Sequence, residues 1–311
     1  MPLSTPPTRF AYLGPEGTFA EAALRTVAAP SEGAPYPRPS VASALDAVRS
    51  GEAGAALVPL ENSVEGSVPA TMDGLADGDR LVITREVFLE VEFTLAARPG
   101  STLSSVRTVA SHPHALAQVS GWLASHDLET VPASSTAAAA RAVAEGEFDA
   151  AVCAPIAAER YGLDRLVDDI ADHRGAVTRF VLVSRPGALP HPTGNDKTSL
   201  VAVVGDRTGA LLSLLSEFAV RGISLSRIES RPTRERIGVY SFSLDCEGHV
   251  LDRRVGEALA ALHRVSEDVR FLGSYPRADG RSNQPVPADA GDAAFAEAEA
   301  WLGRLRGGNA G

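Results

Sequence analysis

The sequence predicts an α/β protein with a two-lobed first domain and a smaller second module. Short apolar strand patterns alternate with alanine-rich helix patterns from residue 9 to about 185. Three prolines and two glycines then mark a linker at 186–197. After the linker the order of elements changes, which indicates a separate fold. A chain of 311 residues is long enough to bury a core in each part.

Composition excludes several functional classes. The 44% hydrophobic and 22% charged residues are ordinary for a soluble globular protein. A net charge of −10 without a long Lys/Arg cluster argues against a nucleic-acid surface. Cys153 and Cys246 are far apart, so neither a disulfide framework nor a zinc site is expected. Residues 1–8 lack a signal pattern, and no apolar run approaches the ~18 residues of a membrane span. We therefore expect a cytoplasmic protein.

In the first domain, strands and helices alternate with little room for hairpins. This pattern predicts mostly parallel sheets with right-handed crossovers. The spacing of Thr18 and Glu21 predicts a capping box at the first helix, and residues 61–67 are expected to form a polar turn before a helix that begins near Pro69. The expected strands are 10–13, 55–59, 81–83, 87–97, 106–110 and 150–152. Further helices are expected at 42–49, at 112–125, after 136, and at 155–161.

The second module reads as βαββαβ, the ferredoxin-like order. Strands are expected at 200–204, 223–229, 237–244 and 269–272, and helices at 208–220 and 255–263. Leu211, Leu214, Leu215 and Phe218 should share one helix face, and Tyr240, Phe242 and Leu244 one strand face. The low-complexity tail, 277–311, contains a predicted helix at 292–306 with Phe295, Ala298, Leu302 and Leu305 on one side; we assign it no function.

Hydroxyl side chains stand at four strand-to-helix junctions of the first domain. They are Thr18, Ser63 to Ser67, Ser111, and Ser134 to Thr136. Helix capping explains each one by itself. As a set they would suit a small carboxylate, because helix N-termini beyond the carboxyl ends of strands attract anions. The sequence does not show whether these junctions converge.

Other polar residues have ordinary explanations. Glu61 and Glu65 could act as an acid or base, or be solvated or paired with an arginine. His112 precedes a proline at a helix start, and His114 is expected at the surface. The Gly14 to Gly17 loop has neither dinucleotide nor P-loop spacing. If the chain is an enzyme, we therefore expect it to use no nicotinamide, ATP or metal.

Five ordered segments of the first domain resemble prephenate dehydratase, which converts prephenate to phenylpyruvate in phenylalanine biosynthesis. The second module resembles the regulatory ACT domain of that family, through segments 209–211, 229–232 and 272–276. Together the resemblance covers roughly 9–276. The first-domain segments are Tyr12 to Phe19, Val58 to Ser67, Ser111 to Pro113, Ser135 to Ala137 and Thr178 to Phe180.

The resemblance implies roles for individual residues. Thr178 would be the catalytic donor to the leaving hydroxyl. Arg179, beside it, would either pair with a substrate carboxylate or only shape the strand end. Glu61 would orient neighbouring groups rather than act as a base. The other residues implied to bind substrate are Asn62, Ser63, Ser111, Ser135, Thr136 and Phe180. Phenylalanine would be bound by Gly209, Ala210, Leu211, Leu212, Glu229, Ser230, Arg231 and Pro232.

The resemblance also implies an architecture. The catalytic domain, 9–185, would be periplasmic-binding-protein-like, with lobe one at about 9–85 and 170–185 and lobe two at about 86–169. The ACT domain would span 198–276 and pair across subunits in a homodimer or homotetramer. Two departures from the family pattern are Ala176, where asparagine is common, and His114, where glutamine is common.

Two other functions remain open from the sequence. Arogenate dehydratase acts on the amino-acid analogue of prephenate, and the motifs barely distinguish it. A non-catalytic sensor of amino acids or anions could use the same cleft, although the intact Thr178 motif favours an enzyme. No chorismate mutase or dehydrogenase segment is apparent, so we interpret the chain as monofunctional.

Overall fold

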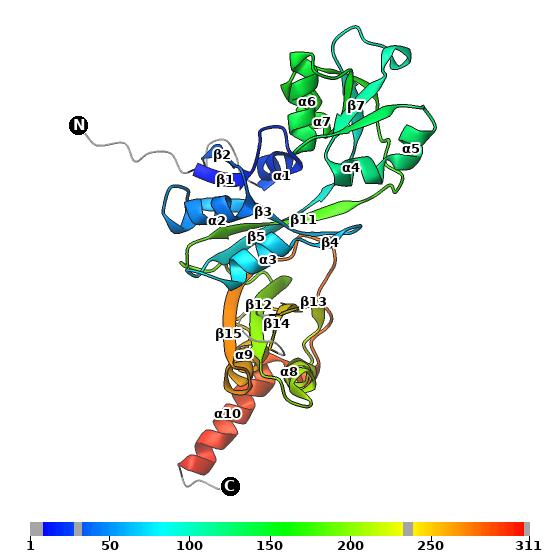
Figure 1. Cartoon of the computed structure of the whole chain (residues 1–311). Helices are drawn as coiled ribbons and strands as arrows, with labels where there is room; N and C mark the ends of the chain where they lie inside the picture. The colour runs from blue at the N-terminus through cyan, green and yellow to red at the C-terminus, as the bar shows by residue number, and fades with distance from the viewer. Residues whose placement is uncertain (1–8, 28–32, 233–238, 308–311) are drawn as a thin grey trace, which may run out of the picture. The chain divides into compact units, whose positions relative to one another are not determined.

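The computed structural model describes residues 9–27, 33–232 and 239–307, and the chain divides into two compact units. The first unit comprises 1–74 and 87–185, and the second comprises 75–86 and 186–311. Figure 1 labels many of the helices and strands of both units. Both units combine helices with sheets, so the predicted α/β class is confirmed.

One lobe of the first unit is built on a mixed sheet in the order β2-β1-β3-β11-β5, with β4 added beside β3. Its strands are β1 (Arg9–Leu13), β2 (Ala34–Arg38), β3 (Ala55–Asn62), β4 (Gly66–Ser67), β5 (Val82–Glu90) and β11 (Val177–Ser184). Its helices are α1 (Phe19–Val27), α2 (Val41–Arg49) and α3 (Pro69–Ala76). Phe10, Tyr12, Leu24, Leu57 and Phe180 pack together in one of its buried clusters.

The other lobe is built on a sheet in the order β10-β6-β9-β7-β8. Its strands are β6 (Thr94–Ala97), β7 (Thr108–Ser111), β8 (Glu129–Pro132), β9 (Ala150–Cys153) and β10 (Asp164–Val167). Its helices are α4 (Pro113–Gln118), α5 (Ser120–Ala124), α6 (Thr136–Glu145) and α7 (Pro155–Arg160), with a 3-10 turn, η1 (Leu103–Ser105). Small alanines of α6 and α7 share a buried cluster with Ala151 and Cys153 of β9. The predicted two-lobed architecture is therefore confirmed.

The expectation of mostly parallel sheets is wrong. β1 runs parallel to β2 and β3, but β11 runs antiparallel to β3. In the other lobe β7 is parallel to β8 and β9, whereas β6 is antiparallel to β9 and β10. The reversed strands enter their sheets by chain segments that pass between the lobes, so no βαβ crossover fixes their direction.

Two local expectations also need correction. The polar turn at 61–67 is part of a hairpin, because β3 extends to Asn62 and pairs with β4. At α1 the Thr18 hydroxyl accepts a long hydrogen bond from the Glu21 amide, 3.4 Å, but the Glu21 carboxylate accepts from the Gly17 amide instead of closing a capping box. Ion pairs with Arg25 and Arg160 also hold the Glu21 carboxylate in this position.

The second unit contains the predicted βαββαβ order, in an antiparallel sheet β13-β14-β12-β15. Its strands are β12 (Asp196–Val204), β13 (Leu225–Pro232), β14 (Tyr240–Glu247) and β15 (Asp268–Pro276), and its helices are α8 (Ala210–Ala219), α9 (Arg253–Val265) and α10 (Asp292–Arg306), with a 3-10 turn, η2 (Ala288–Ala290). Residues 237–238 of the third predicted strand lie outside the described residues. Leu214 and Phe218 are buried as expected, but Leu211 is 39% exposed.

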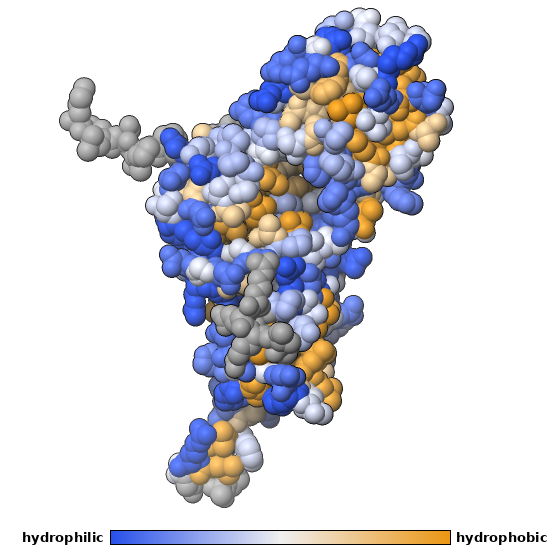
Figure 2. Space-filling model, viewed as in Figure 1, coloured by the Kyte–Doolittle hydropathy of each residue, from blue (hydrophilic) through white to orange (hydrophobic). Residues whose placement is uncertain are grey.

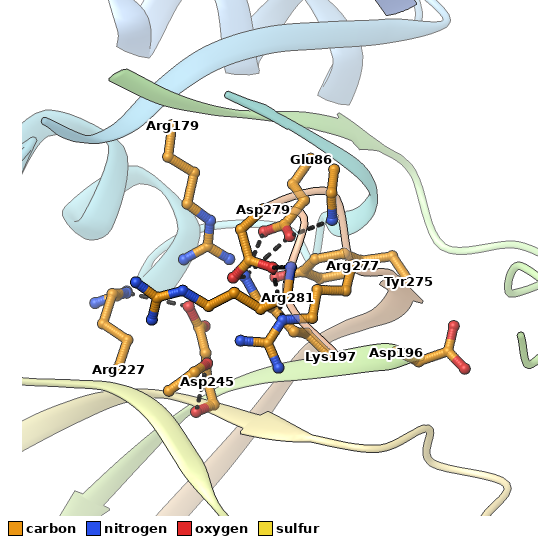
Figure 3. A network of polar contacts seen from close by, with 12 residues as sticks. Glu86, Arg179, Asp196, Lys197, Arg227, Asp245, Tyr275, Arg277, Asp279 and Arg281 are labelled. Carbon is orange, nitrogen blue, oxygen red and sulfur yellow. Dashed lines mark hydrogen bonds and ion pairs between the residues drawn. The ribbon is translucent and has the colours of Figure 1, made fainter. Parts of the chain in front are cut away.

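The face of this sheet opposite to the helices is unexpectedly rich in buried charge. The Lys197 ammonium lies 2.9 Å from the Glu86 carboxylate and 3.1 Å from Asp279. Arg277 joins Asp279 to Glu247, as Figure 3 shows in part. These side chains come from β5, β12, β14 and the segment after β15. They hold 75–86 and the start of the tail against the sheet.

Gly273 is required because segment 75–86 passes close to the backbone of β15 at this position. A Cβ atom at Gly273, whose φ is +133°, would lie 2.3 Å from the Ile83 carbonyl oxygen. This explains in physical terms why the closing strand of the module carries glycine at that position.

In the part of the chain that the structure describes, no helix is long and apolar enough to cross a membrane.

Candidate active site in the cleft of the first unit

A cleft of about 910 Å³ opens between the two lobes of the first unit. Its walls carry the chain after β1, the inward faces of β3 and β11, and the start of α4 and of α6. Of the residues expected to contact substrate, Asn62, Ser135, Thr136, Thr178 and Phe180 line it. Thr178 is 8% exposed, so its side chain is largely shielded but reaches the cleft wall.

A β-bulge directs Asn62 toward Thr178. Side chains of a regular strand alternate between faces, which would place Pro59 and Asn62 on opposite sides of β3. The pairing with β11 shifts between Arg179, opposite Glu61, and Phe180, opposite Pro59. This bulge brings Pro59 and Asn62 to the same cleft wall, where Asn62 faces Thr178.

The Thr178 hydroxyl is oriented by this asparagine. Asn62 Nδ2 donates to Thr178 Oγ1 at 2.8 Å. The amide cannot be reversed without loss, because its Oδ1 accepts from the backbone N–H groups of Val64 and Glu65 at 2.8 and 3.1 Å. Since the threonine oxygen already accepts one hydrogen bond, its own proton is set to donate.

Four residues expected to contact substrate do not line the cleft. Ser111 is fully buried and its hydroxyl donates to the Val152 carbonyl at 2.6 Å. Ser63 Oγ instead accepts from the Val177 N–H at 2.9 Å, which holds β3 and β11 together. Both hydroxyls therefore serve the local structure.

Arg179 and Glu61 are the other two. They are register partners on β11 and β3, with 3.9 Å between Arg179 Nη1 and Glu61 Oε2. Arg179 is 4% exposed and, by strand alternation, lies on the face opposite to Thr178. Of its two expected roles, the geometry favours shaping the strand end over pairing with a substrate carboxylate in the cleft.

The second lobe contributes two helix N-termini to the cleft. Ser135 caps α6, with its hydroxyl accepting from the Ala138 N–H at 2.9 Å, and Thr136 begins that helix. His112 caps α4, with Nδ1 accepting from the His114 N–H at 3.3 Å. Burial and the neighbouring His114 lower the pKa of His112, although Glu65 opposes them. The neutral ring therefore carries its proton on Nε2.

Polar contacts join the lobes beside the cleft. Glu65, from the hairpin, meets His114 Nδ1 at 2.8 Å and Gln118 Nε2 at 2.7 Å. Arg160 of α7 meets Glu16 at 2.8 Å and the buried Glu21 at 2.5 Å. His114, expected at the surface, is indeed mostly exposed, but it also lines the cleft mouth.

Several cleft residues were not predicted from the sequence. Arg38 lies at the end of β2, a strand whose two prolines hid its extended pattern. Arg141 lies on α6, where a single cation in an alanine-rich helix was the available signal. Both guanidinium groups are candidates for a substrate carboxylate. Among the described residues, no group of three or more His, Cys, Asp or Glu side chains is arranged to hold a metal ion.

In the second unit, the residues implied to bind an amino acid lie on two elements. Gly209 starts α8 with a left-handed φ of +78°, and Leu212 on its first turn is 70% exposed. Ala210 is buried and Leu211 partly exposed. Residues 229–232 end β13, which is one of the two edge strands of the sheet. Ser230 and Pro232 are exposed, and Glu229 and Arg231 are half-buried.

Family models match both units of the chain. The model described as prephenate dehydratase matches residues 10–188, more than half of the chain. The chain belongs to the prephenate dehydratase family. A second model, described as the ACT domain, matches 198–264.

Relatives support this membership over nearly the full length. The prephenate dehydratase of Mycolicibacterium vanbaalenii is 51% identical over 313 residues, covering 96% of this chain and 98% of the relative. A crystal structure of prephenate dehydratase from Arthrobacter aurescens in complex with L-Phe is 49% identical, with a TM-score of 0.90, covering 96% of this chain and 99% of that one.

A second similar structure carries a different description. It is called a novel type of quorum-quenching acylase and is 34% identical, with a TM-score of 0.79. The match covers 87% of this chain and 98% of that one. The family fold is therefore similar to that of a protein described by another activity.

Proposed function

We propose that the cleft of the first unit converts prephenate to phenylpyruvate, CO2 and water, with Thr178 as the proton donor. The observation that carries this proposal is the Asn62 to Thr178 hydrogen bond on the cleft wall, which sets the threonine to donate. The relatives described as prephenate dehydratase supply the choice of substrate.

The reaction needs little chemistry from the protein. The bond from the ring to its carboxylate breaks, and its electron pair enters the ring as CO2 leaves. The carbon–oxygen bond at the opposite ring position breaks, and its pair leaves with the hydroxyl, which takes a proton and departs as water. Formation of the aromatic ring drives both changes. Thr178 donates a hydrogen bond to the leaving hydroxyl, with partial proton transfer, and recovers its proton from solvent.

Positioning of two carboxylates is the other task. The ring carboxylate must leave as neutral CO2, so a tight ion pair there would stabilise the starting state and slow the reaction. The side-chain carboxylate of prephenate has no such restriction. We assign it to the cationic part of the cleft, where Arg38, Arg141 and the N-terminus of α6 with Ser135 and Thr136 are available.

Thr178→Ala is the direct test. A positioned proton donor contributes about 10²–10⁴-fold, and turnover of prephenate should fall by that factor. Thr178→Ser keeps a hydroxyl for Asn62 and should keep much of the rate. Unfolding midpoints of both variants control for structure. Phenylpyruvate formation by Thr178→Ala at a near wild-type rate would refute the role of Thr178.

Three alternatives are decided by assays of the wild-type protein. Arogenate carries an ammonium group where prephenate carries a ketone, so turnover of both substrates measured side by side identifies the preferred one. Tight binding of prephenate without turnover would indicate a sensor. Release of an amine from an N-acylated substrate would indicate an activity like that named for the acylase relative.

We further propose that phenylalanine binds the second unit and changes the rate of the first. The segments 209–212 and 229–232 would contact it, and the edge position of β13 suits pairing of two ACT domains in a homodimer or homotetramer. Calorimetry should detect phenylalanine binding to the intact protein, with aspartate as a control ligand. Equal turnover with and without saturating phenylalanine would contradict the regulatory role.

A further inference from the structure

Helix α10 has no buried residue over its 15 positions. Trp301, Leu302 and Leu305 are 54%, 37% and 41% exposed. Figure 2 shows apolar atoms gathered on α10. Isolated helices of about 12–15 residues are marginal in water, and most helices in proteins are stabilised by packing an apolar face. The exposed face of α10 therefore calls for a partner.

The helix is tethered to the second unit by polar contacts in its first half. The Arg253 backbone N–H donates to Asp292 at 3.0 Å, and the Arg253 guanidinium pairs with Glu299. Phe295 is half-buried there. These contacts leave the apolar side chains of the last two turns exposed.

The apolar residues follow a coiled-coil repeat. Phe295, Ala298, Leu302 and Leu305 are separated by three, four and three residues, which matches the a and d positions of a heptad. A stripe with this spacing packs against a second helix. Two heptads are short, so the pairing would be weak alone and would add to another contact between copies.

The charges of α10 favour one partner and one orientation. Asp292, Glu297 and Glu299 lie in its first half, and Arg304 and Arg306 lie in its last turn. Two copies in parallel would place like charges together. Two copies in antiparallel orientation would place Glu297 of each helix beside Arg304 of the other, whereas Asp292 and Glu299 contact Arg253 of their own chain. The helix is therefore complementary to itself.

We propose that α10 pairs antiparallel with α10 of a second copy of this chain. In the register that aligns the two stripes, Phe295 faces Leu305 of the other copy, and Ala298 faces Leu302. This interface uses different residues from the ACT pairing proposed above, and it would strengthen an assembly that another contact between copies already holds.

The first test is the oligomeric state of the full chain. Light scattering after size-exclusion chromatography, repeated over a dilution series, should show that Leu302→Glu/Leu305→Glu falls to a smaller mass at a higher protein concentration than the wild type does. Ala300→Glu is the matched control, because Ala300 is exposed on α10 but outside the stripe, and its mass should be unchanged. An unchanged mass for the double variant would overturn the proposal.

The second test fixes the orientation. Ala298→Cys mixed with Leu302→Cys should give a disulfide between copies, whereas Ala298→Cys alone should give little. Native Cys153 and Cys246 are fully buried and do not compete. Efficient self-crosslinking of Ala298→Cys would show parallel helices and overturn the antiparallel pair, and absence of any crosslink would overturn the pairing itself.

Discussion

The amide of Asn62 donates to the hydroxyl of Thr178, with 2.8 Å between Nδ2 and Oγ1. Replacement of this donor by an acceptor should reverse the bond. In Asn62→Asp the carboxylate would accept a hydrogen bond from the Thr178 hydroxyl. The hydroxyl proton would then point to residue 62 and not to the substrate. We expect kcat to fall by about 10²–10⁴-fold, the range for loss of a positioned proton donor.

A double variant isolates this coupling. If Asn62 acts through Thr178, Asn62→Asp combined with Thr178→Ala should be little slower than Thr178→Ala alone, because residues that act as a unit are not additive. Steady-state rates of phenylpyruvate formation give the comparison. Multiplicative losses would instead mean that Asn62 contacts the substrate independently.

Ser63 should matter for stability and not for substrate binding. Its hydroxyl accepts from the Val177 N–H and lies outside the cleft lining. Ser63→Ala removes one hydrogen bond, worth about 0.5–1.5 kcal/mol of unfolding free energy, and should leave KM for prephenate unchanged. Ser63→Thr keeps the hydroxyl as a control. A several-fold rise in KM for the alanine variant alone would show that Ser63 contributes to substrate binding.

The Arg160 to Glu21 pair predicts a pH-dependent stability. Burial would raise the pKa of Glu21, but hydrogen bonds from the Gly17 N–H, Arg160 and Arg25 outweigh it and hold the pKa below its ordinary value of 4.5. A carboxylate with a lowered folded-state pKa stabilises the protein above the unfolded-state pKa. This stabilisation is lost as the pH falls below that value.

Arg160→Met should therefore lower the free energy of unfolding most at neutral pH. The expected loss is about 1.5–3 kcal/mol, the value of a hydrogen bond to a charged group. The difference from wild type should shrink as the pH falls below 4.5. Urea unfolding at several pH values measures it, and Arg160→Lys keeps the charge as a control. A difference that is constant across pH would mean that Arg160 contributes only packing.

Lys197 is predicted to be needed for stability, because the carboxylate of its partner Glu86 is shielded from water. The Glu86 side chain is 0% exposed and the ammonium of Lys197 lies 2.9 Å away. Lys197→Met leaves this carboxylate buried without that cation, which should destabilise the protein by about 3–5 kcal/mol. Adding Glu86→Gln removes the charge and should restore part of the loss. Equal midpoints for the single and double variants would contradict the assignment.

The sequence by itself determined the order of elements and the identity of the family. Strand and helix periods are local, so the βαββαβ order and the two-lobed pattern could be inferred from residue spacing. The motif around Thr178 likewise needed no tertiary information. Asn62, Ser135, Thr136 and Phe180 were also selected by motif, and all four line the cleft.

Only the tertiary structure decided where side chains point. A shift of one residue turns a side chain to the other face of a sheet, so the bulge opposite Arg179 decides that Asn62 enters the cleft while Arg179 and Glu61 do not. Strand direction, the recruitment of Arg38 and Arg141, and the buried charges around Lys197 depend on segments distant in sequence. Such contacts leave no periodic signal in the chain, which is why spacing could not predict them.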